Sequence, residues 1–146
     1  MAQKIPLLYE NVFSKSPEKA ITAQKIPTKL ECKLLNLGRY EYPSGAVVYV
    51  GTEILVYANL YYQKPGGTWD WLPGKTINVY HRLNTGSWEK IGTITTGVED
   101  PGYGWGTLKY KLVAAGKHTF YNEFPGDATY VGCEKAVRAF AKRSSC

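Results

Sequence analysis

The sequence predicts an all-β domain. Fifteen Gly, eight Pro and twelve Tyr among 146 residues favour short strands joined by tight turns. Several segments alternate apolar and polar residues, and no long amphipathic helical period appears. With 44% hydrophobic and 14% aromatic residues, the chain is apolar enough to build one core.

Alternation and turn residues place the predicted strands in order along the chain. They fall at residues 28–36, 46–50, 52–63, around Ile77 and Val79, at 88–95, around Leu108 and Leu112, at 116–124 and at 133–141. Residues 37–45 and 63–74 are predicted loops, and Asn84-Thr85-Gly86-Ser87 is a predicted hairpin turn.

Because side chains alternate between the two faces of a strand, each strand also has a predicted inward face. On residues 52–63, Glu53, Tyr57 and Asn59 should then face outward. The inward residues are Leu30, Cys32, Leu34, Ile54, Val56, Ala58, Leu60, Ile77, Val79, Leu108, Tyr110, Leu112, His118, Phe120, Phe124, Val137, Ala139 and Ala141.

The last segment is open to a second interpretation. Ala136, Val137 and Phe140 also sit at helical spacing, and the surrounding residues are good helix formers. Asn122 lies on the predicted strand at 116–124, and if it is buried there, its amide needs hydrogen-bond partners.

A turn over residues 124–130 is the most informative segment of the chain. Pro125 presets φ for a turn, Gly126 supplies a positive φ, and the Asp127 side chain is suited to bonding the turn amides. Phe124 and Tyr130 bracket the bend with two rings. The residue types therefore predict a structural turn rather than a catalytic loop.

This turn resembles the last hairpin of the immunoglobulin-like repeat domains that bacteria, archaea and their viruses display on surfaces. The resemblance covers residues 46–141, and its pieces follow the order of the family. They lie at residues 50–60, 73–80, 92–96, 100–112 and 116–124. The resemblance implies an immunoglobulin-like antiparallel β-sandwich and favours the strand interpretation of the last segment.

Three regions result: an N-terminal arm at 1–27, a sandwich at 28–141 and a C-terminal tail at 142–146. The two ends carry most of the net charge of +6, with +2 on residues 1–27 and +3 on 134–146. Solvated tails explain such charge, and contact with an acidic partner is the alternative.

The arm contains a short repeat. Ala2-Gln3-Lys4-Ile5-Pro6 recurs as Ala23-Gln24-Lys25-Ile26-Pro27, and each Pro favours an extended conformation of the residue before it. One interpretation is a docking arm that presents Lys4, Ile5 and Pro6 together with Lys25, Ile26 and Pro27 to a partner or a sheet edge. The other is a chance or local duplication.

Aromatic side chains are the best candidates for a binding site. Trp69, Trp71, Tyr103 and Trp105 lie in or beside two loops rich in Gly and Pro. Rings of this kind either pack under loops as small cores or, where exposed, mark an interface with a protein, a sugar or a nucleic acid.

Other chemistry has little support. No Ser or Cys has an evident paired base, and the Cys and His spacing matches no zinc pattern, so we expect no enzyme activity, no metal and no cofactor. A calcium site at Glu99-Asp100 is a minor alternative to local hydrogen bonding.

Cys32 and Cys133 fall in the first and last predicted strands, which neighbour each other in many sandwiches, so a disulfide between them is a hypothesis.

These observations predict a non-catalytic module that works by protein–protein contact. The resemblance implies a virion structural or decoration protein, or a component of an extracellular surface assembly, bound to a capsid, tail or surface-layer protein or to itself. A carbohydrate-binding module using the loop rings is the first alternative, and nucleic-acid binding through the basic ends is the second. We expect no membrane insertion, because the chain shows neither a membrane-spanning apolar run nor a secretory signal.

Overall fold

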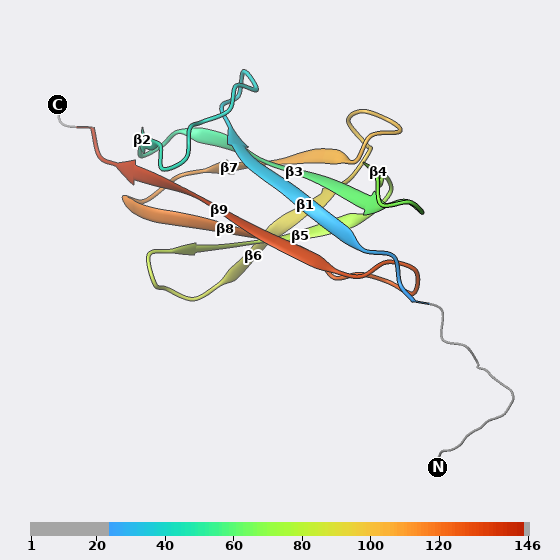
Figure 1. Cartoon of the computed structure of the whole chain (residues 1–146). Coiled ribbons are helices and arrows are strands. Elements are labelled where there is room, and N and C mark those ends of the chain that lie inside the picture. Colours follow the sequence, from blue (N-terminus) through green and yellow to red (C-terminus); the bar gives the residue numbers. More distant parts are fainter. Residues whose placement is uncertain (1–23, 145–146) are drawn as a thin grey trace, which may run out of the picture.

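The computed structural model describes residues 24–144, and within this range the chain forms nine strands and no helix (Figure 1). The strands are β1 (Thr28–Leu35), β2 (Val47–Tyr49), β3 (Glu53–Gln63), β4 (Trp69–Trp71), β5 (Thr76–Leu83), β6 (Glu89–Thr95), β7 (Trp105–Lys111), β8 (Gly116–Phe124) and β9 (Cys133–Lys142). The all-β prediction is therefore confirmed for the described residues.

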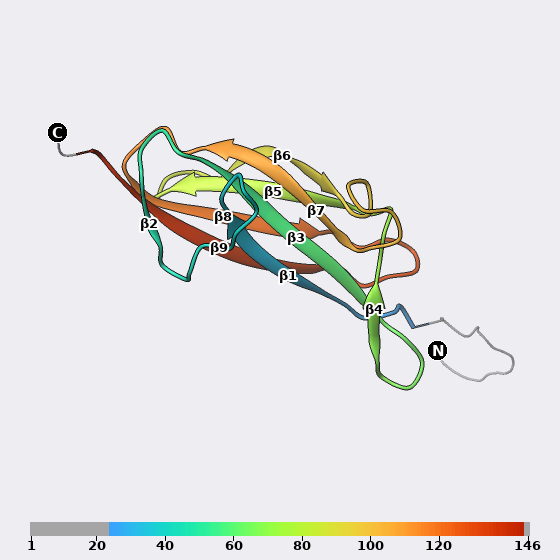
Figure 2. The same cartoon turned by 90° about the horizontal axis from the view of Figure 1, so that it is seen from above.

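The strands form two sheets that lie face to face (Figures 1 and 2). In the four-stranded sheet, β3 pairs with β1 along one side and with both β4 and β7 along the other. The five-stranded sheet has the order β2-β9-β8-β5-β6. All strand pairs are antiparallel except β2 with β9, which is parallel.

The core lies between the two sheets and is built by the predicted inward faces. On β3, Ile54, Val56, Ala58 and Leu60 are fully buried, while Tyr57 faces outward as predicted. Leu108, Tyr110 and Val137 are half-buried at the margin of this core. The other predicted inward residues are buried, namely Leu30, Cys32, Leu34, Ile77, Val79, Leu112, His118, Phe120, Phe124, Ala139 and Ala141.

The last segment is a strand, which resolves its two interpretations. β9 pairs with β8 without interruption from Gly116 opposite Ala141 to Phe124 opposite Cys133. The helix-forming residues of β9 therefore yield to tertiary pairing, which routinely overrides local propensity. Asn122 is fully buried, and its Nδ2 donates to the backbone oxygen of Lys135 at 3.2 Å.

One predicted loop needs correction. Residues 63–74 were predicted to form a loop, but Trp69–Trp71 make the short strand β4. Its backbone pairs with the end of β3, with Trp71 opposite Tyr61 and Trp69 opposite Gln63. This pairing fixes both Trp residues to the sheet.

The turn at 124–130 forms as its residues predict. Gly126 has a φ of 85°, and one oxygen of Asp127, Oδ1, accepts the backbone N–H groups of Thr129 at 2.9 Å and Tyr130 at 2.8 Å. The other oxygen, Oδ2, lies 2.7 Å from the Lys75 ammonium. These interactions, with the Lys75 hydrogen bond the largest, lower the pKa of Asp127 to about 2.

Candidate interaction face

An aromatic surface covers the outer face of the four-stranded sheet. Tyr57 and Tyr61 point outward from β3, and residues directly opposite each other in a sheet share a face. Trp105 lies opposite Asn59, and Trp71 lies opposite Tyr61. We call the following set the aromatic face: Tyr57, Tyr61, Trp69, Trp71, Tyr103 and Trp105.

The structure brings all four predicted binding residues to this one face. Trp69, Trp71 and Tyr103 are exposed, with relative accessibilities of 37%, 41% and 39%, and Trp105 is half-buried. Trp69, Trp71 and Trp105 belong to strands rather than to loops. Trp69 and Trp71 are therefore exposed on the surface of the sheet.

The rings pack against one another in two groups. Tyr57 stacks on Trp105, with ring centroids 5.7 Å apart and an interplanar angle of 25°. Trp71 and Tyr103 have centroids 4.4 Å apart at 52°. Tyr57 and Tyr61 were not among the predicted site residues, although the alternation of residues 52–63 already placed Tyr57 on the outer face.

Cations lie over these rings. The Lys29 ammonium is 4.5 Å from the ring centroid of Trp69 and 5.5 Å from that of Tyr61. Lys33 lies 5.5 Å from Tyr57, and the Arg39 guanidinium lies 5.7 Å from Trp105. Each contact places positive charge against the negative face of an aromatic ring and stabilises the observed side-chain arrangement.

A buried amide joins the tyrosines of the aromatic face. Asn59 is only 5% exposed although it points outward, because Tyr57, Tyr61 and Trp105 surround it. Its Nδ2 donates to the hydroxyls of Tyr57 at 3.3 Å and Tyr61 at 2.9 Å. The Tyr61 hydroxyl donates in turn to Glu31 at 3.2 Å. Burial and the Glu31 charge raise the pKa of both phenols, so both hydroxyls keep their protons.

The loop between β1 and β2 is tied to this face by an ion pair. Arg39 Nη2 lies 2.7 Å from Glu99 Oε1, and Glu99 Oε2 accepts from the backbone N–H of Thr107 at 2.9 Å and from its hydroxyl at 2.5 Å. Burial raises the pKa of Glu99, but the Thr107 and Arg39 interactions outweigh it and lower the pKa. Both carboxylate oxygens of Glu99 are therefore used in local bonds. This arrangement agrees with the expectation that Glu99 bonds locally instead of binding calcium.

Glycine allows the aromatic face to form. Gly104 stands between Tyr103 and Trp105, and its oxygen accepts the Leu60 N–H at 2.7 Å. A Cβ at Gly104 would lie 2.2 Å from the Leu60 oxygen. Only a residue without a side chain permits this approach, which sets the positions of both neighbouring rings.

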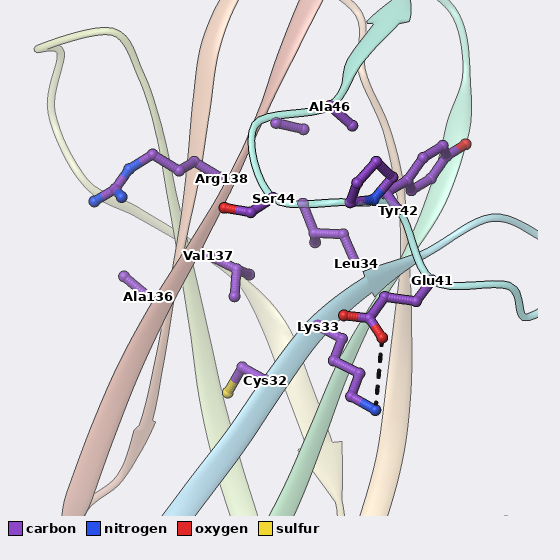
Figure 3. A pocket seen from close by; sticks show the side chains of 12 residues that line it. Cys32, Lys33, Leu34, Glu41, Tyr42, Ser44, Ala46, Ala136, Val137 and Arg138 are labelled. Atoms are coloured by element: carbon purple, nitrogen blue, oxygen red, sulfur yellow. Dashed lines mark ion pairs between the residues drawn. The ribbon is translucent and has the colours of Figure 1, made fainter.

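A groove of about 210 Å³ separates β1 from β9 beside the loop at 36–46 (Figure 3). Cys32 and Val137 lie at its floor, and Lys33 and Glu41 form an ion pair of 3.8 Å at its rim. Burial raises the pKa of the Cys32 thiol to about 12, so the nucleophilic thiolate is not available at neutral pH. Cys32 and Cys133 are both free thiols in the structure.

The described part of the arm bonds to its own sandwich. The Ile26 N–H donates to the Thr129 oxygen at 2.9 Å, and the Ile26 oxygen accepts from Val131 at 2.9 Å. The Pro27 oxygen accepts from Gln63 at 3.0 Å, and Lys25 is exposed. Lys4, Ile5 and Pro6 lie outside the described residues.

No protein-family model matches the chain, and no curated protein matches it in a sequence search. Within residues 24–144, no three His, Cys, Asp or Glu side chains gather as a metal site would require. The same part of the chain has no helix with the length and apolar character needed to cross a membrane.

Proposed function

We propose that this protein is a non-catalytic binding domain that contacts a protein partner through the aromatic face. The observation that carries the proposal is the exposed group of Trp and Tyr rings interleaved with Lys29, Lys33 and Arg39. Trp, Tyr and Arg are the residues that dominate binding energy at protein interfaces. A surface of this composition on a rigid sheet is suited to recognition without chemistry.

The strand order supports an immunoglobulin-like assignment of the sandwich. In chain order β1, β3 and β7 match strands A, B and E of that fold, which share a sheet. β9, β8 and β5 match strands G, F and C, which form the opposite sheet in the same order. The sequence resemblance to surface-displayed repeat domains adds to the proposal a virion structural or decoration role, or a place in an extracellular surface assembly.

Carbohydrate binding is the second candidate, because a platform of rings on one sheet face is what stacking on sugars requires. The cations weigh against it. Lys29 lies over Trp69 and Tyr61, Lys33 over Tyr57 and Arg39 over Trp105, so these rings already have a partner. A sugar would have to displace a favourable contact at each of them, whereas a protein partner with acidic groups would add to it.

Nucleic-acid binding is supported less, because the charges on this face are mixed. Glu31 lies between Lys29 and Lys33 on β1, and Glu99 neutralises Arg39. A nucleic acid is a polyanion and is attracted by a patch of positive charge, which this mixed surface does not provide.

Substitution of the exposed rings tests these alternatives together. We expect Trp69→Ala and Trp71→Ala to leave the melting temperature nearly unchanged, because substitutions of exposed residues usually change stability by about 0.5 kcal/mol or less. Soluble oligosaccharides should not change the intrinsic Trp fluorescence of the wild-type protein. A saturable sugar titration that is lost in both variants would replace our proposal with carbohydrate binding.

A further inference from the structure

A second aromatic site lies on the opposite side of the molecule, on the outer face of the five-stranded sheet. Tyr80, Trp88, Tyr121 and Glu123 line a hollow of about 300 Å³. This is far more than the roughly 10–15 Å³ that one water molecule needs on the same measure. The hollow is open to solvent, and three of its four lining side chains are aromatic, so it is suited to a small ligand group rather than to a single water.

Strand pairing brings the three rings together. Tyr80 on β5 lies directly opposite Tyr121 on β8, and their ring centroids are 6.1 Å apart. Trp88 precedes β6, and its ring centroid lies 5.7 Å from that of Tyr121. The register of β5 with β6 shifts between Val79 and Tyr80. Such an irregularity re-aims side chains at a sheet edge, here beside Trp88.

Hydrogen bonds hold two of the lining side chains. The Tyr121 hydroxyl donates to Glu134, and Asn78 Nδ2 lies 3.5 Å from Glu123 Oε1. The bond to Glu134 restrains the Tyr121 hydroxyl, and the contact with Asn78 positions the Glu123 carboxylate at the edge of the hollow. The site is therefore prepared before a ligand arrives.

The chemistry of this lining selects positive charge. Aromatic faces carry negative electrostatic potential, and three rings with one carboxylate form a cage for an organic cation. Trp88 already holds a cation of the chain, because the Arg82 guanidinium lies 4.6 Å from its ring centroid, so a ligand cation would share this ring with Arg82. Within residues 24–144, no Lys or Arg of the chain lies over Tyr80 or Tyr121 at such a distance. These two rings, unlike Trp69, Tyr57 and Trp105 of the aromatic face, are open to a ligand cation.

We infer that this hollow binds an alkylated ammonium group, such as the trimethylammonium head of a small molecule or of a methylated lysine side chain. A bare ammonium would lose much of its hydration against three apolar rings, with one carboxylate to compensate. A trimethylammonium group keeps the charge and presents methyl groups to the rings. This site is separate from the proposed protein interface, and its function does not depend on that proposal.

Titration of the full chain with choline tests the inference, with 3,3-dimethylbutan-1-ol as the neutral control of the same shape. Trp fluorescence and NMR shifts of the Tyr80 and Tyr121 rings are the readouts. We expect choline to bind and the neutral alcohol to bind at least roughly tenfold more weakly, since a desolvated cation–π contact is lost. Equal binding of the two compounds would overturn the inference, and so would no binding of either choline or a trimethyl-lysine peptide.

Matched variants locate the site. Trp88→Ala and Glu123→Gln should each weaken choline binding by about tenfold, whereas Trp71→Ala on the opposite face should leave it unchanged. Glu123→Gln keeps the shape of the side chain, so it remains informative if Trp88→Ala folds poorly. Unchanged affinity in Glu123→Gln would overturn the assignment. A short peptide with trimethyl-lysine, measured beside its unmethylated form, separates the two sources of the ammonium group. Tighter binding of the methylated peptide than of choline indicates a methylated lysine on a partner, and weaker binding indicates a free small molecule.

Discussion

His81 Nε2 lies 2.8 Å from His118 Nδ1, and the two rings form a hydrogen bond inside the core. His118 Nε2 lies 2.7 Å from the Ala114 oxygen, and because a carbonyl only accepts, that nitrogen carries a proton. In one arrangement of the chain of bonds, His118 Nδ1 accepts from His81 Nε2, and His81 Nδ1 accepts from the Tyr110 hydroxyl at 3.3 Å. In this arrangement His81 is neutral, with its proton on Nε2.

Acid should therefore destabilise the fold before its carboxylates titrate. Burial, followed by the proximity of His118, lowers the pKa of His81 from its usual 6.5 to about 4. The unfolded chain binds a proton near pH 6.5 and the folded chain does not, so the free energy of unfolding falls as pH drops from about 6.5 to 4. The slope is about 1.4 kcal/mol per pH unit, or roughly 3 kcal/mol across the window.

Urea unfolding at intervals between pH 7.5 and pH 4 measures this slope. His81→Phe should show a flatter profile over the same range, whatever its absolute stability. A wild-type profile that stays level from pH 6.5 to pH 4 would show that His81 is protonated in the folded protein.

Phe120 should be a major contributor to the core. Its ring is fully buried between the sheets, with the His81 ring centroid at 5.1 Å and the Tyr110 centroid at 5.3 Å. We expect Phe120→Ala to reduce the free energy of unfolding by about 3 to 5 kcal/mol, because it removes a buried ring and leaves a cavity. Phe140→Ala is the matched control, since Phe140 is 37% exposed on the outer side of β9. Similar losses in the two variants would contradict the assignment of inward and outward faces.

Asp127→Asn tests the turn at 124–130. Because the folded pKa of Asp127 is about 2 and its ordinary value is 3.8, the carboxylate contributes stability above pH 3.8 and loses it as pH falls toward 2. The variant should melt at a lower temperature than the wild type at neutral pH, and the difference should vanish near pH 2. Glu41→Gln, which removes a longer and more exposed ion pair with Lys33, should change the melting temperature less. A difference for Asp127→Asn that is independent of pH would exclude the ion pair with Lys75 as its cause.

Alternation along the chain predicts most of the core, because one face of each long strand is mainly apolar. On β3 the buried set from Ile54 to Leu60 follows directly from this pattern. Alternation does not predict β4, because three residues are too few to show a repeat of apolar and polar positions. Trp69–Trp71 form a strand through their pairing with β3. β9 was ambiguous because its residues favour a helix locally, and only its neighbour β8 decides.

The candidate sites were predictable in part for a similar reason. Composition identifies Trp69, Trp71 and Trp105, but the cations over Trp69 and Trp105 come from β1 and from the loop that carries Arg39. The hollow beside Tyr80 depends on the pairing of β5 with β8, which local sequence does not encode. Sites of this kind emerge from the register between distant strands.

Photo-crosslinking from position 103 tests the proposed interface most directly. A benzoylphenylalanine in place of Tyr103 extends from the aromatic face, and the same group in place of exposed Thr93 on the other sheet is the control. In the native assembly, we expect a discrete protein adduct from position 103, and we expect Trp71→Ala to reduce it strongly by removing the ring packed against position 103. An adduct of equal yield from position 93, or none from position 103 in an assembly that still contains the protein, would contradict the aromatic face as its contact surface.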